Sequence, residues 1–130
     1  MILYTYDSFL FDVFLEEKEA FIATKRKQRA DSVSIEKVLI SPEKYKDRVL
    51  VSSVFLTGSA VQMGVGFVVN FKPSLTSEYD LWLLAPKDTT DKADRIRSAR
   101  GQYEQSTIKY WCSGEMDNIL PRGWILLDVE

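Results

Sequence analysis

Apolar residues in the first part of the chain recur at intervals of three and four, the spacing of an amphipathic helix. A helix is expected from Phe9 to about Arg29, after an N-cap at Asp7-Ser8. Cations close this segment, where they favour the negative end of the helix dipole. Residues 2–6 before it are expected to form a short strand. The apolar stripe of the helix consists of Leu10, Phe11, Phe14, Leu15, Phe21 and Ile22.

The middle of the chain has the composition and alternation of β-strands. Val33 to Ile40 is expected as a strand that ends at Ser41-Pro42. Residues 49–57 are apolar on both alternations, which predicts a strand covered on both faces. Gly58-Ser59 predicts a hairpin turn, and residues 60–71 then alternate cleanly. The residues expected to face the core are Val61, Met63, Val65, Phe67, Val69 and Phe71.

Three further elements complete the expected fold. A strand over residues 78–85 ends at Pro86, a second helix runs from about Lys92 to Cys112, and a last strand covers Gly123 to Val129. These elements predict one α+β domain over residues 1–130. It is an antiparallel β-meander of about four to five strands, packed with an N-terminal helix and a second helix before the last strand.

Composition places the chain among ordinary globular domains. It has 130 residues, of which 45% are hydrophobic and 28% charged. Cys112 is the single cysteine, so no disulfide forms within the chain, which indicates a reducing compartment or indifference to redox. A cytoplasmic protein is expected. The apolar N-terminus lacks a basic region, which argues against a signal peptide and a membrane span.

The chain contains no histidine, which excludes every imidazole-based mechanism and leaves carboxylate and tyrosine chemistry open. Cys112 lies late in a predicted helix, where the dipole disfavours a thiolate, so packing is its expected role. Gly64-Val65-Gly66 lies within a strand and is not a phosphate loop. We therefore predict no catalytic residue, no metal site and no cofactor, and we favour a non-enzymatic role. The acidic pairs are expected on solvated faces: Glu16/Glu17/Glu19, Glu78/Asp80 and Glu115/Asp117.

One face of the predicted sheet is a candidate for contacting a partner. If residues 60–71 pair with residues 78–85 so that Phe67 and Leu83 share the core face, the opposite face is shallow and carries one large aromatic side chain. Trp82 is expected to lie across a glycine on this face, and tryptophan is enriched at interface hot spots. The alternative is that another element covers it. The predicted partner-binding residues are Trp82, Asp80, Gly66, Gly64, Asn70 and Gln62.

Charge is segregated along the chain, with an acidic N-terminal segment followed by a basic one over residues 25–48. This pattern suits a protein partner better than a polyanion, because the net charge is −2. The basic run at residues 25–29 has no aromatic platform beside it and is expected to be solvated. The helix arginines have partners at helical spacing, namely Asp91 with Arg95, Asp94 with Arg97, and Arg100 with Glu104.

We therefore expect a non-enzymatic protein-binding module, such as a small acidic inhibitor, an immunity or anti-defence protein, or a dedicated chaperone. A homodimer through an uncovered sheet face is compatible with this expectation. The alternative is a small-ligand domain, or a histidine-independent enzyme with a pocket lined by Tyr, Asp and Arg. Nucleic-acid binding ranks third, and membrane association is not expected.

Overall fold

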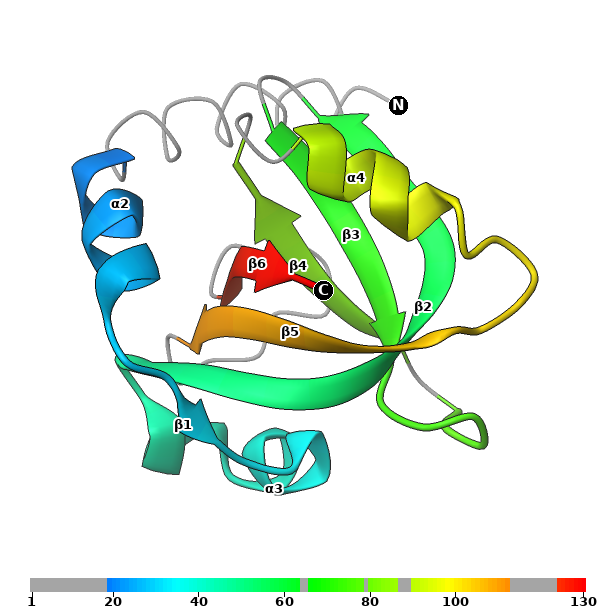
Figure 1. Ribbon diagram of the computed structural model, residues 1–130. Coiled ribbons are helices and arrows are strands. Elements are labelled where there is room, and N and C mark those ends of the chain that lie inside the picture. Colours follow the sequence, from blue (N-terminus) through cyan, green and yellow to red (C-terminus); the bar gives the residue numbers. More distant parts are fainter. Residues whose placement is uncertain (1–18, 64–65, 79, 87–89, 113–123) are drawn as a thin grey trace, which may run out of the picture.

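Five strands of the protein close into a β-barrel (Figure 1). The computed structural model describes residues 19–63, 66–78, 80–86, 90–112 and 124–130. Around the barrel the strands follow the order β2-β3-β4-β6-β5, and β5 pairs back onto β2. All these pairs are antiparallel except β4 with β6. The barrel strands are β2 (Arg48–Met63), β3 (Gly66–Lys72), β4 (Leu81–Ala85), β5 (Gln105–Cys112) and β6 (Trp124–Val129).

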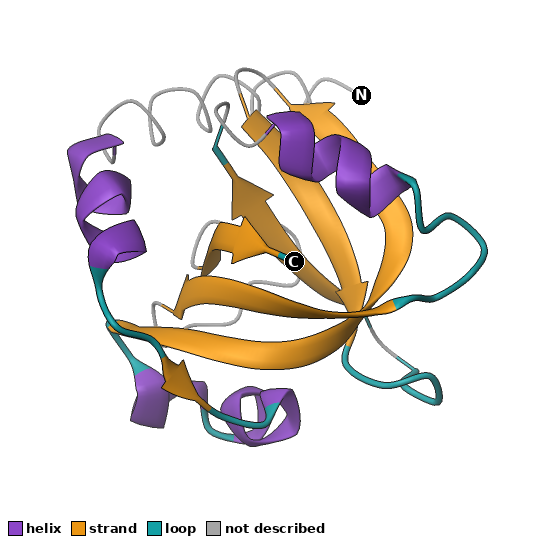
Figure 2. Ribbon diagram, in the orientation of Figure 1, coloured by secondary structure: helices purple, strands orange, loops and turns teal. Residues whose placement is uncertain are grey.

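Shorter elements surround the barrel (Figure 2). A two-residue strand, β1, pairs in parallel with the first half of β2. The strand order, with a helix between the third and fourth barrel strands, is the connectivity of Greek-key barrels of the OB type. The remaining elements are α2 (Glu19–Lys27), β1 (Asp31–Ser32), α3 (Ile35–Ile40), the 3-10 helix η1 (Pro42–Tyr45) and α4 (Thr90–Arg97).

The predicted single-domain α+β class is confirmed, and the predicted meander is confirmed in part. β2, β3 and β4 form an antiparallel meander in chain order. β5 and β6 instead close the sheet, with β6 inserted between β4 and β5. The prediction lacked this closure because strand order depends on pairings between distant parts of the chain, which local periodicity does not encode.

The predicted hairpin at Gly58-Ser59 is wrong, because β2 continues through these residues to Met63. The register with β3 shifts between Leu56 and Ala60, so the strand carries an irregularity there. Gly58 has φ +85°, and a Cβ atom at this position would lie 2.4 Å from the Cα of Arg100. Glycine is therefore needed at position 58 because β2 bends there and passes close to the backbone of Arg100, and not because the chain reverses direction.

The predicted strand at Val33–Ile40 is also wrong, because most of this segment forms helix α3. Ser34 stands at the N-cap of this helix, in an extended conformation. The buried residues Ile35 and Val38 are three positions apart, which places both on one helical face against the barrel. In so short a segment, helical and strand periodicities are difficult to distinguish.

The second predicted helix ends early, and its expected C-terminal half is strand β5. The helix α4 stops at Arg97, and positive φ angles follow at Gly101 (79°) and Tyr103 (49°). The reversal sends the chain back across the barrel. The side chains of β5 then alternate, with buried residues at Ser106, Ile108, Tyr110 and Cys112.

Other predicted elements are confirmed. β6 occupies the predicted last strand, β4 lies within the predicted 78–85 strand, and α2 lies within the predicted N-terminal helix. The expected coverage of both faces of residues 49–57 holds at Val49 and Leu50, but Ser53 is exposed. The predicted strand at residues 2–6 and the first half of the N-terminal helix lie outside the described residues.

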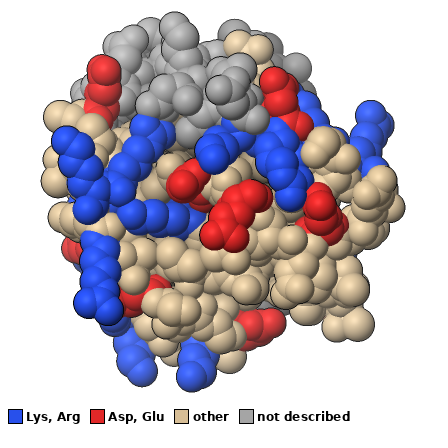
Figure 3. All heavy atoms as spheres, viewed as in Figure 1, with Lys and Arg blue, Asp and Glu red and all other residues tan. Residues whose placement is uncertain are grey.

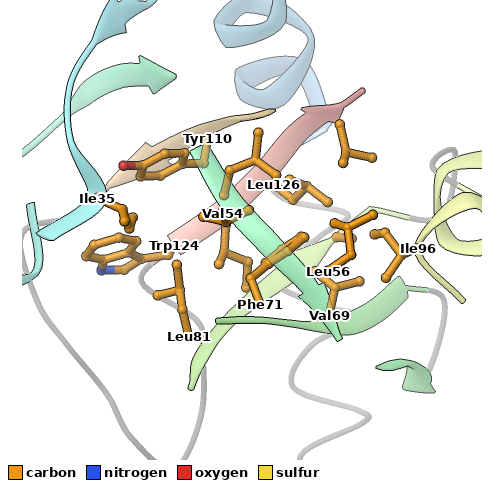
Figure 4. Close-up of a cluster of buried hydrophobic side chains, with 14 of the residues drawn as sticks. Ile35, Val54, Leu56, Val69, Phe71, Leu81, Ile96, Tyr110, Trp124 and Leu126 are labelled. Carbon is orange, nitrogen blue, oxygen red and sulfur yellow. The ribbon is translucent and has the colours of Figure 1, made fainter. Parts of the chain in front are cut away.

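Buried side chains in the described part of the chain form two apolar clusters. The larger one fills the barrel, where the Tyr110 and Trp124 rings stack with centroids 5.6 Å apart (Figure 4). Within it, Ser52 Oγ lies 2.8 Å from the Tyr110 hydroxyl and donates to the carbonyl of Val33 at 2.8 Å. Burial raises the pKa of Tyr110 above its ordinary value, although the Ser52 hydrogen bond opposes this shift.

The second cluster lies on the outer side of the barrel, beneath α2. The helix contributes Ile22 and Phe21, and the Phe21 ring meets the Trp111 ring edge-on at 5.1 Å. Lys109 fixes the end of the helix, because its ammonium group donates to the carbonyls of Arg26 and Gln28, both at 2.8 Å. The barrel contributes Val49, Val68, Leu84, Ile125 and Leu127 to this cluster.

Candidate binding face

The face predicted to bind a partner is the outer side of β3 and β4, and the strand register confirms the predicted grouping for the residues that these two strands contribute. Asn70 lies opposite Trp82, and Val68 lies opposite Leu84. Phe71 pairs with Leu81 on the inner side, as expected from the alternation. The sequence therefore predicted correctly which side chains of β3 and β4 point away from the barrel interior.

Trp82 does not lie across a glycine, so that part of the prediction is wrong. Its cross-strand partner is Asn70, whereas Gly66 is buried at the start of β3 and pairs with Met63. Gly64 lies outside the described residues. Gln62 is exposed near the end of β2, but it lies opposite Phe67, whose side chain belongs to the cluster that fills the barrel, so its predicted place on this face is wrong. The structure therefore places Gly66 and Gln62 at the opposite end of β3 from Lys72 and Asp80.

Only part of this face is open. Val68 is 7% exposed and Leu84 is fully buried, so the half of the face toward α2 belongs to the second apolar cluster. Trp82 is 39% exposed. The accessible part of the face is therefore centred on the indole ring and on the neighbouring pair, Lys72 and Asp80.

The Lys72–Asp80 pair makes the open end of the face electrically balanced. The Lys72 ammonium lies 4.0 Å from Asp80 Oδ1 and donates to the Ser77 carbonyl at 3.3 Å. It also lies 5.9 Å from the centre of the exposed Tyr103 ring. The sequence analysis missed Lys72, although its position two residues after Asn70 puts it on the same face of the strand.

Asn70 is the unusual residue of the face. The residue is only 4% exposed, and its Nδ2 atom is buried without a hydrogen-bond partner among the described residues. The backbone carbonyl of Asn70 is satisfied, because Thr57 Oγ1 donates to it at 3.1 Å. A buried donor without a partner destabilises a protein by about 1–3 kcal/mol, so such a group calls for an explanation.

Cys112, which the sequence analysis considered as a possible reactive residue, lies in the packed interior. Cys112 is fully buried at the end of β5, rather than in a helix, and its thiol lies 3.8 Å from the Pro42 carbonyl. This confirms that packing surrounds the thiol.

Most of the described cations lie beside carboxylates or on exposed helix ends. Arg97 pairs with Asp94 at 3.4 Å as expected, but Glu104 pairs with Arg95 at 2.8 Å rather than with Arg100. The side chain of Asp91 lies outside the described part. Figure 3 shows cations and anions interspersed on one side of the molecule, with cations gathered near α2.

One exposed carboxyl group has a perturbed proton affinity. Ser34 Oγ donates to Glu36 Oε2 at 2.6 Å, and this hydrogen bond lowers the pKa of Glu36. Within the described ranges, no three acidic or cysteine side chains are grouped to hold a metal ion. Among the helices described, none has the length and apolar character needed to cross a membrane.

No family model, curated protein or solved structure matches the chain. The geometry of the β3–β4 face is therefore the basis for a functional interpretation.

Proposed function

We propose that this protein is a non-enzymatic binding module that holds a protein partner on the outer face of β3 and β4. The observation that carries the proposal is the pairing of an exposed indole, Trp82, with a buried amide donor on Asn70 for which the described part of the chain provides no acceptor. Tryptophan contributes strongly to binding at the centres of interfaces, because a large rigid ring is removed from water.

Two gains on complex formation support the proposal. Burying the remaining exposed part of the Trp82 ring is favourable through the hydrophobic effect. A partner would reach Asn70 Nδ2 only after the side chains that bury this atom move, and an acceptor supplied there would then remove the penalty of the unsatisfied donor. The neutral Lys72–Asp80 pair beside them imposes no net charge on the partner at this point.

The experiment compares variants of the full chain in partner capture. Trp82→Ala removes the indole, whereas Leu75→Ala removes another exposed apolar side chain (59%) from the loop between β3 and β4. All proteins that the wild type retains are then purified, and their affinities for the wild type and for both variants are measured. We expect at least a tenfold weaker complex for Trp82→Ala, as found for interface hot spots, which contribute about 2 kcal/mol or more. Equal affinities of the two variants for every purified partner contradict the proposal.

A second candidate function is binding of single-stranded nucleic acid, and the strand order favours it. In OB-type barrels the second and third strands carry the face that binds oligonucleotides, and β3 and β4 hold these positions. Fold alone does not assign a function, and the net charge of −2 opposes polyanion binding. A labelled oligothymidine titrated at low salt tests this candidate, since binding that depends on Trp82 favours it over a protein partner.

The alternative of a tyrosine-lined pocket draws less support. Tyr45 and Tyr110 are buried in the larger apolar cluster, and Tyr103 is exposed on a turn. The inhibitor, immunity or chaperone role, the homodimer and the cytoplasmic location stay predictions of the sequence.

A further inference from the structure

We infer that a basic surface, formed where the end of α2, β1 and η1 meet, binds an acidic segment of a protein partner, rich in Asp and Glu. This inference goes beyond the proposed function, because the surface belongs to elements other than β3 and β4. It follows from where the fold gathers cations and from how few of them have a carboxylate beside them. The basic surface consists of Lys27, Arg29, Lys44, Lys46 and Arg48.

Segments that are separate in the sequence bring these cations together. β1 follows Arg29 closely and pairs in parallel with the first half of β2. Arg48 at the start of β2 donates to Asp31 of β1 at 2.6 Å, so the run that ends α2 lies beside the region around η1. α2, β1 and α3 follow one side of the barrel in Figure 1, and Figure 3 shows cations along the same side.

Two cations of the basic surface are held around one aromatic ring. The Lys44 ammonium lies 5.9 Å and the Arg48 guanidinium 5.5 Å from the centre of the Tyr45 ring. Tyr45 is only 8% exposed and belongs to the larger apolar cluster, so this ring is fixed. Cations that are already ordered lose less conformational entropy when they bind an anion.

The cations of the basic surface differ from those of β3 and α4 in having few anionic partners. All members except Arg48 form no ion pair with a carboxylate of the described residues, and all members are exposed. Residues 25–48 contain eight Lys or Arg and four Asp or Glu, so positive charge is in excess there. Such an excess attracts anionic partners from solution. Every cation of β3 and α4, in contrast, forms an ion pair, namely Lys72, Lys92, Arg95 and Arg97.

An acidic protein segment suits this surface better than a nucleic acid does. Exposed carboxylates at Asp31, Glu43 and Asp47 lie between the cations in the sequence, and they oppose the continuous row of charges on a phosphate backbone. The separate carboxylates of a peptide meet the cations one at a time. Bases also need exposed aromatic rings on which to stack, whereas Tyr45 is buried. Clusters of cations that recognise acidic motifs are a recurring mode of peptide binding.

The test is the binding of a labelled, end-blocked octaglutamate peptide to the full chain, measured by fluorescence anisotropy. We expect binding at about 0.01 M salt that weakens at about 0.15 M, where the screening length falls from about 30 to about 8 Å. The triple variant Arg29→Gln, Lys44→Gln, Lys46→Gln should bind about tenfold more weakly, the combined effect of three exposed ion pairs. Because these side chains are exposed and form no ion pair, the variant should unfold in urea like the wild type.

The matched control is the triple variant Lys92→Gln, Arg95→Gln, Arg100→Gln, which changes the net charge equally on and just after α4. It should weaken binding of the peptide by less than about twofold, because these charges lie away from the basic surface and are screened. An equal loss of affinity in both triple variants overturns the inference, since net charge then accounts for the binding.

Two further outcomes also overturn the inference. One is the absence of octaglutamate binding at low salt. The other is labelled oligothymidine that binds more tightly than the peptide and loses affinity only in the Arg29, Lys44 and Lys46 variant, because the surface then recognises a nucleic acid. The proposed function is tested separately, since both triple variants leave β3 and β4 unchanged.

Discussion

Gly58→Ala tests the close approach between β2 and the turn after α4. The added Cβ would lie 2.4 Å from the Cα and 2.8 Å from the backbone nitrogen of Arg100, distances that only a movement of the backbone can relieve. The residue also has φ +85°, a conformation that costs a non-glycine residue about 1–2 kcal/mol. Overpacking adds about 1–3 kcal/mol, so we expect a loss of about 2–5 kcal/mol in the free energy of unfolding.

The matched control is Gly101→Ala. Gly101 has a similar φ of +79°, but no heavy atom lies within 4 Å of its added Cβ. This variant should lose only the conformational part, about 1–2 kcal/mol. Urea unfolding of both variants, followed by circular dichroism, measures the difference. If Gly58→Ala is no less stable than Gly101→Ala, the reasoning about the close approach is refuted.

Three more measurements test other contacts. Arg97 donates to the carbonyl of Ala60 through Nε at 2.9 Å and through a second nitrogen at 2.6 Å; Arg97→Met should destabilise the protein by about 1 kcal/mol in urea unfolding, and an unchanged midpoint would contradict this. Tyr110→Phe removes the hydroxyl that contacts Ser52 and should lower the free energy of unfolding by about 1 kcal/mol in the same assay. Because burial raises the pKa of Tyr110, its phenol should ionise only when the protein unfolds in alkali, which is seen as a late rise in the ultraviolet absorbance of tyrosinate. Glu36 should titrate below its ordinary pKa in a nuclear magnetic resonance experiment that follows the carboxyl carbon. Its small contribution to stability is therefore present above the ordinary pKa and is lost as the pH falls through the lowered pKa. Ser34→Ala should raise the pKa of Glu36, and an unchanged pKa would refute the assigned cause.

Local patterns in the sequence predicted the elements whose periodicity is strong and uninterrupted. The alternation in residues 66–71 and 81–85 identified both strands and the side chains on each face, because the register of an antiparallel pair is fixed by its buried side. The candidate face followed from the same alternation. Its degree of exposure did not, since the burial of Val68 and Leu84 depends on what packs on the outside of the barrel.

The errors have a common physical origin. The interval from Tyr103 through Thr107 to Tyr110 satisfies a helical spacing, but the buried positions alternate every second residue once the chain has turned. Gly58 was expected to form a turn, but the glycine is needed because the backbone of Arg100, more than forty residues later in the chain, lies close to it. Contacts with distant parts of the chain decide between helix and strand, or between a turn and a close approach, and these contacts cannot be derived from local patterns in a single sequence.

The path of β2 has a consequence for how the chain reaches its native state. The first half of β2 finds its antiparallel neighbour in β5, and the Ser52–Tyr110 contact within this region spans 58 residues. During synthesis, the first half of β2 therefore has no β5 to pair with at the time when the second half of β2 can already pair with β3. Contacts of such long range slow folding. β6 follows the other four barrel strands in the chain and fits between β4 and β5, so a nascent chain that does not yet include residues 124–130 exposes two strand edges that invite self-association. The pairing of residues 124–129 with both neighbours therefore converts an open sheet with two free edges into a closed barrel.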